Sequence, residues 1–458
     1  GKTTTTSLIS KIFSEAKLDP TIINGGVINS LKGSAKLGKG DWAILEADES
    51  DGSFLKLPVT YSIITNLDKE LLPKLGTIFI GETWHKLLIP CNRRNIIDIT
   101  ISGETIKHCL NSNSSVVIMS HLNRPLGKVV LDYSLDPVAF ALEEMLSKEV
   151  MFSSDCISDD AIALSGQMQA GEVHLLENLR FHKEEELNSE SFAKELSKNG
   201  DIYINEAFSC SHRAHASVSE ITKHISAFAG KQLIEELNVI KMLSENAKKP
   251  ATCIIGGSKI STKSGIIVNL IKKMQNIIIV GGMANIFIKY KGYNIGKSIF
   301  EKDQENLIEK IIKESKKNNC NLLLPEDVVT SKNHDSKGLL KNLDDINDED
   351  LILDVGEKTL KNITKIIDES KTVLWNGPAG YFEIDEFSMG SKKIAKKISE
   401  NTKTKSLISI AGGGDTIAAI NKFKFSDGFT YLSTAGGAFL ELLEGKILPG
   451  IKALEINE

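Results

Sequence analysis

Residues 407–418 read LISIAGGGDTIA, and this stretch predicts the fold of the C-terminal half of the chain. The apolar run at 407–410 is typical of a buried strand, and the residues after Gly414 return to helical spacing. The glycines between them let backbone amides come close to a phosphate, and a helix start adds unsatisfied N–H groups. A tight turn without a ligand is the competing interpretation. Asp415 would either cap the helix or hold a cation shared with phosphates.

The composition is that of an ordinary globular protein. A chain of 458 residues with a formal net charge of −5 and 41% hydrophobic residues favours an α/β protein of two or three domains. The near balance of charge gives no argument for a nucleic-acid partner or a membrane. No apolar run approaches the roughly 18 residues of a membrane span, and no signal peptide opens the chain, so we expect a cytoplasmic location. The six cysteines form no C-x-x-C pair, which indicates reduced thiols without a zinc site.

The first residues have the form of the end of a P-loop that runs into an amphipathic helix. In that interpretation Lys2 reaches the terminal phosphates of a nucleotide and Thr3 a magnesium ion. Asp41–Leu45 reads as a strand that leads to several carboxylates, among them Glu49, where a metal–nucleotide site would use them; a charged loop is the alternative. The earlier glycines of the P-loop would precede Gly1, so we expect the chain to be truncated at this end.

The string NGGVINSLKGSAKLGKGDWAILEADESDGSF at 24–54 resembles the Mur ligase family, and within it the UDP-N-acetylmuramate:L-alanine ligase. The resemblance ends near Asp68, and no ligase C-terminal domain follows. We therefore interpret residues 1–68 as a Mur ligase central-domain fragment, a partial P-loop α/β unit without ligase activity. Lys2, Thr3 and Glu49 would be remnants of the ligase site. Residues 69–97 match neither this fragment nor the sequence that follows them. We interpret them as a junction of the kind that joining two unrelated coding pieces would leave.

Three predicted strands further along the chain each end in basic side chains. The strands are Ser115–Met119, Val173–Leu176 and Asp201–Ile204, and the groups that follow them are His121 with Arg124, then Arg180, then Arg213. Ligands of open α/β sheets bind at the carboxyl ends of strands, and the planar fork of arginine suits phosphate and carboxylate. We therefore infer an anionic substrate. A metal at His212 and His215 is disfavoured, because no further ligands lie nearby in the sequence.

These motifs resemble the phosphoglycerate kinase family. SHLNRP at 120–125 stands for the family's SHLGRP, LENLRF at 176–181 is unchanged, and NEAFSCSHRAHAS at 205–217 stands for NDAFGTAHRAHAS. The departures include Asn123 for Gly, where a Cβ sits in a loop that needs the φ freedom of glycine, and Glu206 for Asp. The resemblance implies that 3-phosphoglycerate is bound by His121, Leu122, Asn123, Arg124, Arg180 and Arg213.

The second half of the chain continues the resemblance. Residues 231–248 have apolar side chains at helical spacing and should form a helix that connects two lobes. After the strand Ala251–Ile255, Lys259 and Lys263 lie four apart at a glycine-opened helix start, so both can point at one anion; two solvated lysines are the alternative.

GGSKISTK at 256–263 is similar to the family's GGAKVSDK, and WNGPAGYFE at 375–383 to WNGPMGVFE. The resemblance implies a nucleotide site made of Lys259, Lys263, Asn376, Glu383, Gly412, Gly413, Gly414, Asp415 and Thr416. It also implies that Asp415 holds Mg²⁺, and that the catalytic residues are Arg213, Lys259, Lys263, Gly413 and Gly436.

The resemblance spans about 105–458 and implies an α/β fold with two Rossmann-like lobes, parallel sheets and a hinge helix. The predicted lobes are 98–230, to which the tail 444–458 returns, and 231–443. We expect a monomeric enzyme that uses Mg²⁺ and moves a phosphoryl group between 1,3-bisphosphoglycerate and ADP. The other substrate pair is ATP and 3-phosphoglycerate. The family's opening strand and one substrate arginine are missing, so we expect impaired activity.

Other functions stay open at this point. One is a catalytically inactive chimera of a Mur ligase fragment and a truncated kinase, which binds Mg-nucleotide only. Another is a Mur-type ATP-dependent ligase, for which alanine-dependent ATP hydrolysis would be required and is not expected.

Overall fold

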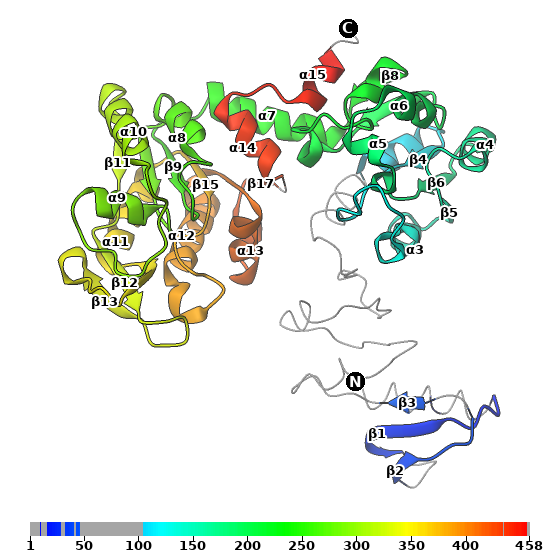
Figure 1. Cartoon of the computed structure of the whole chain (residues 1–458), viewed down its shortest axis with the longest axis horizontal. Coiled ribbons are helices and arrows are strands. Elements are labelled where there is room, and N and C mark those ends of the chain that lie inside the picture. Colours follow the sequence, from blue (N-terminus) through cyan, green and yellow to red (C-terminus); the bar gives the residue numbers. More distant parts are fainter. Residues whose placement is uncertain are drawn as a thin grey trace. The chain divides into compact units, whose positions relative to one another are not determined.

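The computed structural model describes residues 10, 16–28, 33–40, 43–45, 104–433 and 435–455 (Figure 1). Lys2, Thr3, Glu49 and the junction 69–97 lie outside these described residues. The chain divides into two compact units. The described part of unit 1 consists of residues up to 45 with 118–155 and 172–181, and that of unit 2 of 104–117, 156–171 and 182–455.

The N-terminal part of unit 1 contains a small sheet of three strands in the order β2-β1-β3. The strands are β1 (Thr21–Ile28), β2 (Gly33–Lys36) and β3 (Ala43–Leu45). β1 pairs antiparallel with β2 and parallel with β3. The predicted strand at 41–45 is present as β3, whereas the P-loop prediction concerns residues that are not described and stays a prediction.

The remaining part of unit 1 is a parallel α/β segment. β5 (Val150–Ser153) and β6 (Val173–Leu176) pair in parallel, and they belong to a three-stranded sheet of order β4-β6-β5 with β4 (Val116–Ile118). Helix α3 (Asp136–Leu146) precedes β5 and buries Val138, Ala139 and Leu142. The predicted strands at 115–119 and 173–176 are therefore confirmed.

Unit 2 begins with a helical segment at 104–111 and contains a second, two-stranded parallel sheet. Its strands are β7 (Ile202–Asn205) and β8 (Ser226–Ala229), so the third predicted strand is confirmed one residue later than expected. The helices of this part are α4 (Asp159–Gln167), α5 (Lys183–Glu186) and α6 (Glu190–Ser197). The long helix α7 (Lys231–Glu245) then follows Gly230 directly, close to the predicted range of 231–248.

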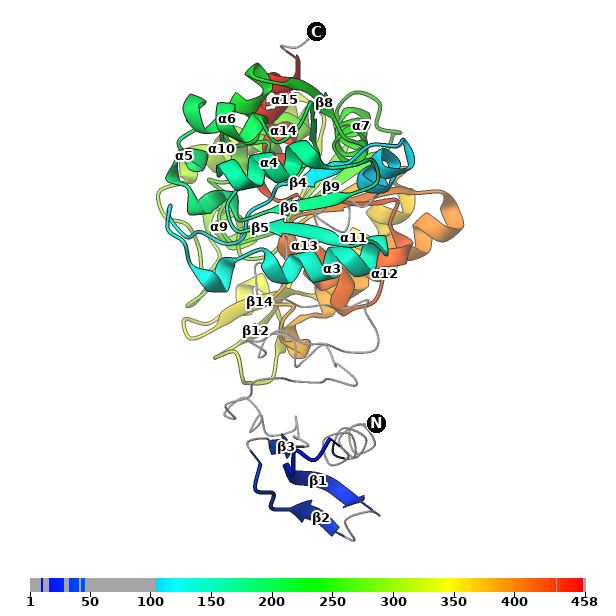
Figure 2. The same cartoon turned by 90° about the vertical axis from the view of Figure 1, so that its right-hand side faces the viewer.

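Six parallel strands form the central sheet of unit 2 in the order β11-β10-β9-β15-β16-β17. Figure 1 labels β9, β11, β15 and β17 of this sheet, and Figure 2 shows the same structure turned by 90°. They are β9 (Ala251–Ile255), β10 (Asn276–Ile279), β11 (Asn321–Leu323), β15 (Thr372–Asn376), β16 (Ile408–Gly412) and β17 (Tyr431–Ser433). The order runs outward from β9 in one direction and from β15 in the other. The boundary between these strands is a topological switch point, the place where open α/β sheets bind ligands.

Helices cover both faces of this sheet. The strands contribute side chains to two separate apolar cores. One core contains side chains from α7, α8 (Ser264–Ile271), α9 (Ala284–Tyr290), α10 (Glu305–Lys317) and α14 (Gly437–Glu444). The other contains side chains from α11 (Glu357–Glu369), α12 (Met389–Lys405) and α13 (Gly414–Lys422). The predicted α/β fold with parallel sheets is confirmed.

One part of unit 2 departs from the parallel pattern. β12 (Asp327–Ser331), β13 (Leu339–Asn342) and β14 (Leu351–Val355) form an antiparallel sheet of order β13-β12-β14, which the sequence patterns did not predict. The chain ends in α15 (Pro449–Glu455). Within the described part of the chain, no helix has the length and apolar character to span a membrane.

Candidate active site

The glycine turn at 412–414 follows β16 and opens α13, as the strand–turn–helix pattern predicted. Gly413 has a φ of +95°, a conformation that other residues rarely adopt. A Cβ at this position would also lie 2.7 Å from Nδ2 of Asn376. Thr416 is buried in the first turn of α13, and its hydroxyl accepts a hydrogen bond from the amide of Gly377 at 2.7 Å. The backbone here therefore has the shape required at a helix start that receives an anion.

Asn376, the last residue of β15, connects the turns on both sides of its strand. Its Nδ2 donates a hydrogen bond to the carbonyl of Gly412 at 2.6 Å, and its Oδ1 accepts one from Nζ of Lys263 at 2.6 Å. Lys263 Nζ also donates to the carbonyl of Gly256 at 2.7 Å. These bonds join the turns after β9, β15 and β16 at the switch point of the sheet.

The glycines after β9 and β15 allow the two turns to touch. A Cβ on Gly256 would lie 2.2 Å from the carbonyl oxygen of Pro378, and one on Gly377 would lie 2.4 Å from the carbonyl carbon of Gly256. Between these turns, Trp375 is completely buried, and its indole N–H donates to the carbonyl of Gly377 at 2.8 Å. Side chains larger than hydrogen would therefore separate the turns that Asn376 links.

The electrostatic environment of Lys263 differs from that of an exposed lysine. Burial lowers the pKa of its ammonium group from 10.5 to about 8, and the charges of Cys253 and Asp415 oppose this effect. The acceptors around Nζ are neutral carbonyl and amide oxygens. An anion placed at this switch point would therefore favour the charged form of Lys263.

Lys259 and Lys263 do not share a helical face, which corrects the prediction from their spacing. Helix α8 begins at Ser264, after both lysines, because the glycine pair and a turn occupy 256–263. Gly257 has a φ of +115°, which no helix contains. Lys263 consequently turns toward Asn376, whereas Lys259 is exposed.

The other predicted nucleotide residues lie on neighbouring parts of unit 2. Gly414 and Asp415 are exposed in the first turn of α13. Glu383 is exposed as well, and its carbonyl accepts a hydrogen bond at 3.0 Å from Nζ of Lys422, which belongs to α13. The structure thus brings the segment that contains Glu383 to the same helix as Asp415.

His212, which precedes Arg213 in the chain, lies at the start of α14, where Gly436 is the residue before the helix. Arg213 Nε donates a hydrogen bond to His212 Nε2 at 3.2 Å. A Cβ on Gly437 would lie 3.2 Å from the same His212 nitrogen. Burial, and next the charge of Arg213, lower the pKa of His212, so the imidazole is neutral and accepts this bond. The close approach in this region is therefore between His212 and Gly437, which are the chain neighbours of the predicted catalytic residues Arg213 and Gly436.

The predicted triose residues of unit 1 form a group of their own. Arg180 is buried, with 5% exposure, and its Nη1 donates to the carbonyl of Asn123 at 2.7 Å. Asn178 Nδ2 donates to the carbonyl of Leu122 at 2.8 Å. Both contacts hold the loop of His121, Leu122, Asn123 and Arg124, in which Leu122 is buried and Arg124 is exposed.

Some supporting residues were missed by the sequence patterns. The sequence patterns contain Asn178 only as part of the LENLRF motif, and they assign no role to Glu236 of α7. The Glu236 carboxylate accepts hydrogen bonds from the Ser433 hydroxyl at 3.0 and 2.9 Å.

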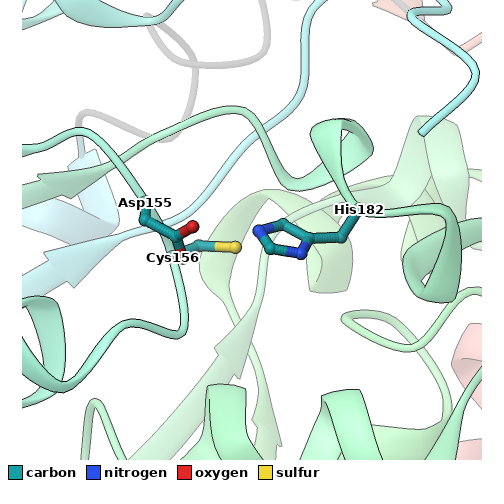
Figure 3. Close-up of side chains that lie close together, drawn as sticks. All are labelled: Asp155, Cys156 and His182. Carbon is teal, nitrogen blue, oxygen red and sulfur yellow. The ribbon is translucent and has the colours of Figure 1, made fainter. Parts of the chain in front are cut away.

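Figure 3 shows Asp155, Cys156 and His182, whose potential ligand atoms lie within 4.8 Å of one another. Their sequence spacing matches no metal motif, and no fourth His, Cys, Asp or Glu of the described segments joins this group.

Comparisons with known proteins agree with this geometry. The family model described as Phosphoglycerate kinase matches residues 90–446. The chain belongs to the phosphoglycerate kinase family. Phosphoglycerate kinase from Borrelia duttonii is 42% identical over 373 residues, which are 80% of this chain and 94% of that protein. The phosphoglycerate kinase of Wolbachia from Culex pipiens is 44% identical over 351 residues, 76% of this chain and 88% of the relative.

Solved structures of phosphoglycerate kinases are similar in fold. The enzyme from Coxiella burnetii has a TM-score of 0.71 at 38% identity, covering 78% of this chain and 90% of that structure. The enzyme from Pyrococcus horikoshii has a TM-score of 0.67 at 26% identity, covering 79% and 92%. The function of the chain is that of a phosphoglycerate kinase, and the inactive chimera is not favoured. The family match begins at residue 90, ahead of the SHLNRP motif at 120–125.

Proposed function

We propose that this phosphoglycerate kinase transfers a phosphoryl group between 1,3-bisphosphoglycerate and ADP, with 3-phosphoglycerate and ATP as the other pair. The observation that carries the proposal is the link between three strand-end turns at the switch point, made by Asn376 and Lys263. Such transfer depends mainly on positioning and on charge neutralisation, so it needs no covalent intermediate on the protein.

In this proposal the start of α13 binds the nucleotide phosphates. The amides of the glycine turn at 412–414 and the helix dipole favour negative charge there, with Thr416 beside them. Lys263 lies at the junction of the turns and neutralises the transferred phosphoryl group, while exposed Lys259 reaches the phosphates from the solvent side. Glu383 contacts the ribose. These roles agree with the contact between the segment of Glu383 and α13.

The residues present also suit a magnesium ion. Asp415 offers an exposed carboxylate at the start of α13, and its charge acts on Lys263, the residue before α8. Carboxylate oxygens are ligands that Mg²⁺ prefers, together with substrate phosphates. Asp415 would therefore hold the ion, which when bound supplies positive charge to the phosphate oxygens.

The triose substrate would bind through unit 1 and Arg213. His121, Leu122, Asn123, Arg124 and Arg180 form one group, and the guanidinium groups suit the carboxylate and phosphate of 3-phosphoglycerate. Arg213, Gly413 and Gly436 would stabilise the charge that moves between the substrates in the transition state. The 3.2 Å bond from Arg213 to His212 supports a fixed orientation of that arginine.

The remaining parts of our interpretation are proposals of the same kind. Residues 1–68 would be the Mur ligase-like fragment with a partial P-loop, and 69–97 the junction. The lobes would be 98–230 with the tail 444–458, and 231–443 with the hinge helix at its start. We further expect a monomer and a cytoplasmic location, whereas alanine-dependent ATP hydrolysis is not expected.

A coupled assay with ATP and 3-phosphoglycerate tests the proposal on the full chain. We expect turnover, and we expect Lys263→Met to lower kcat by about 10²–10³-fold because one charge-stabilising donor is lost. Lys337→Ala removes an exposed lysine from the loop between β12 and β13 and should leave kcat unchanged. No turnover at high enzyme concentration, or equal losses in both variants, would contradict the proposal.

A further inference from the structure

A buried carboxylate that has no part in the proposed reaction lies next to the segment that contains Arg213. Glu185 of α5 is only 2% exposed. Its Oε1 accepts a hydrogen bond from the Ser217 hydroxyl at 2.6 Å, and its Oε2 accepts one from the Ser217 amide at 2.9 Å. Because a buried charge is costly unless it is paired and hydrogen-bonded, contacts of this kind are what make a carboxylate tolerable at this position.

Glu185 also contacts two further residues of that segment. Its backbone carbonyl accepts a hydrogen bond from the amide of Ala216 at 2.9 Å. His215 Nδ1 lies 3.7 Å from Glu185 Oε1, within the range of an ion pair when the imidazole is protonated. His215, Ala216 and Ser217 are all buried. Glu185 therefore contacts three consecutive residues, and the first of them is two positions after Arg213.

The backbone around Arg213 needs contacts of this kind, because residues 211–217 form turns and loop rather than a helix or a strand. On the N-terminal side, the Arg213 amide donates a hydrogen bond to the carbonyl of Cys210 at 2.9 Å. On the C-terminal side, Glu185 provides the contacts to 215–217. Ala214, which is exposed, is the one residue between Arg213 and these contacts. Arg213 thus lies between two fixed points of the backbone.

The orientation of the Arg213 side chain is sensitive to this backbone. Its Nε donates to His212 Nε2 at 3.2 Å, and the residue is half-buried. A guanidinium group binds an anion through a planar fork, so a small displacement of the backbone changes which oxygen atoms it can reach. In an active site, a misplacement of about 1 Å can reduce the rate by about 10²-fold.

We propose that Glu185 is a positioning residue for Arg213. Its carboxylate fixes the backbone at 215–217, and this backbone fixes the orientation in which Arg213 meets the transferred phosphoryl group. The inference rests on the proposed function, in which Arg213 stabilises the charge that moves between the substrates. In this role Glu185 contacts no substrate, so it is not a catalytic residue.

Steady-state kinetics on the full chain test this role. Glu185→Gln keeps the size of the side chain, but its amide nitrogen cannot accept the bond that one carboxylate oxygen accepts. We expect kcat to fall by about 10–100-fold while KM for ATP stays unchanged, because Arg213 acts on the triose and the transferred group. Ser217→Ala removes only the hydroxyl bond and should lower kcat less. Glu186→Gln, at the exposed neighbouring residue of α5, is the matched control and should leave kcat unchanged.

A double-mutant cycle separates positioning from a general loss of stability. In an Arg213→Lys background the planar fork is already absent, so Glu185→Gln should change kcat by less than about twofold there. A substitution that only unfolds a fraction of the molecules would cause the same relative loss in both backgrounds. Equal losses therefore overturn the proposal, as does an unchanged kcat in both Glu185→Gln and Ser217→Ala. Ser217→Ala is taken through the same cycle, so the test stands even if Glu185→Gln does not fold.

A spectroscopic measurement needs no turnover, so it separates this proposal from the proposed reaction. The chain has five arginines, and Arg213→Lys identifies the Nε–H signal of Arg213 in NMR spectra of protein with isotope-labelled arginine. We expect this Nε–H to exchange slowly with water in the unaltered chain and in Glu186→Gln, and faster in Glu185→Gln and Ser217→Ala. Equal exchange in all four proteins overturns the positioning role. If the unaltered chain shows this exchange pattern but no turnover, the proposed reaction is contradicted while the link from Glu185 to Arg213 is supported.

Discussion

At the scale of single residues, Lys263 shows how a buried position changes the chemistry of a side chain. Its ammonium donates to Gly256 and Asn376, and burial lowers its pKa to about 8. The two acceptors lie 7 and 113 residues away in the sequence. The motif resemblance therefore identified Lys263, but the link to Asn376 depends on strand order, which no local pattern contains.

The pH dependence of the kinase should show this lowered pKa. In the nucleotide-free protein, Lys263 is charged below about pH 8 and loses its proton as the pH rises through that value. We expect kcat/KM for ATP to fall above about pH 8, because the neutral amine no longer attracts phosphate. Arginine stays charged in this range, so the profile of Lys263→Arg should lack the inflection even if its rate is lower. Steady-state kinetics from pH 6 to 10, which brackets the pKa of about 8, measure both profiles.

Asn123 has the backbone conformation that its loop requires. This residue replaces the family's glycine, and its φ of +56° is left-handed. Asparagine is among the few residues besides glycine that adopt this conformation readily. The loop therefore keeps the shape that glycine would give it, and its carbonyl accepts the hydrogen bond from Arg180.

Substitutions at Asn123 should follow this backbone requirement. Asn123→Gly should leave the free energy of unfolding nearly unchanged, whereas Asn123→Val should lower it by about 1–2 kcal/mol, the cost of a left-handed conformation. Denaturant unfolding of the three proteins measures the difference. Equal stability of the glycine and valine variants would show that the loop does not hold this conformation.

At the scale of elements, the start of α7 depends on a side chain from another segment. Glu206 accepts hydrogen bonds from the amides of Gln232 at 3.1 Å and Leu233 at 3.2 Å, which have no partners inside the helix. Gly230 leaves space for that carboxylate, since a Cβ there would lie 2.2 Å from the Glu206 Cδ. In the sequence, Glu206 is recognisable only as a replacement for the family's Asp, and no pattern predicts its capping role.

Removal of this cap should destabilise the helix. Glu206→Ala should lower the free energy of unfolding by about 0.5–2 kcal/mol, as the loss of N-terminal caps does. Glu206→Gln keeps acceptor capacity and should cost less. Glu245→Ala, at the exposed last residue of α7, is the matched control and should change stability little. A loss in the control as large as that in Glu206→Ala would exclude capping as the cause.

Elements with clear apolar runs could be predicted, and those without them could not. β9, β15 and β16 are fully or almost fully buried parallel strands, so their residues form continuous apolar stretches. The antiparallel strands β13 and β12 carry lysine and serine beside their apolar residues, and this weaker pattern was not recognised. The start of α8 was predicted too early, because the glycines before it were assigned to the helix opening.

At the scale of the whole molecule, the family match covers both the sequence around Arg180 and the nucleotide side. The N-terminal part of this match is harder to predict from motifs, because the family's opening strand has no counterpart among the motifs of the sequence analysis. We propose residues 1–68 as a fragment of another family, and the sequence patterns within such a fragment do not predict how it joins a second fold. The candidate site was consequently predicted most completely where all of its turns come from one sheet.

This difference predicts unequal binding of the two substrates. Calorimetry on the full chain should detect Mg-ATP binding through the turns at Asn376 and Gly413, while 3-phosphoglycerate should bind more weakly than it does to the Borrelia duttonii relative. Each lost charge-assisted contact to a substrate costs about 1.5–3 kcal/mol, or roughly 10–100-fold in affinity. Equal affinity for 3-phosphoglycerate in both proteins would show that other residues supply the missing contacts. Absence of Mg-ATP binding would contradict the assigned nucleotide turns.

The buried indole of Trp375 gives the nucleotide turns an optical reporter. Its ring lies in the central strand β15, stacks against Phe429 with centroids 6.4 Å apart, and bonds to the backbone of Gly377. The chain has three tryptophans, so a variant with Trp42→Phe and Trp84→Phe emits from this ring alone. The wavelength and intensity of that emission would then follow the turns in real time as nucleotide arrives, without any attached dye.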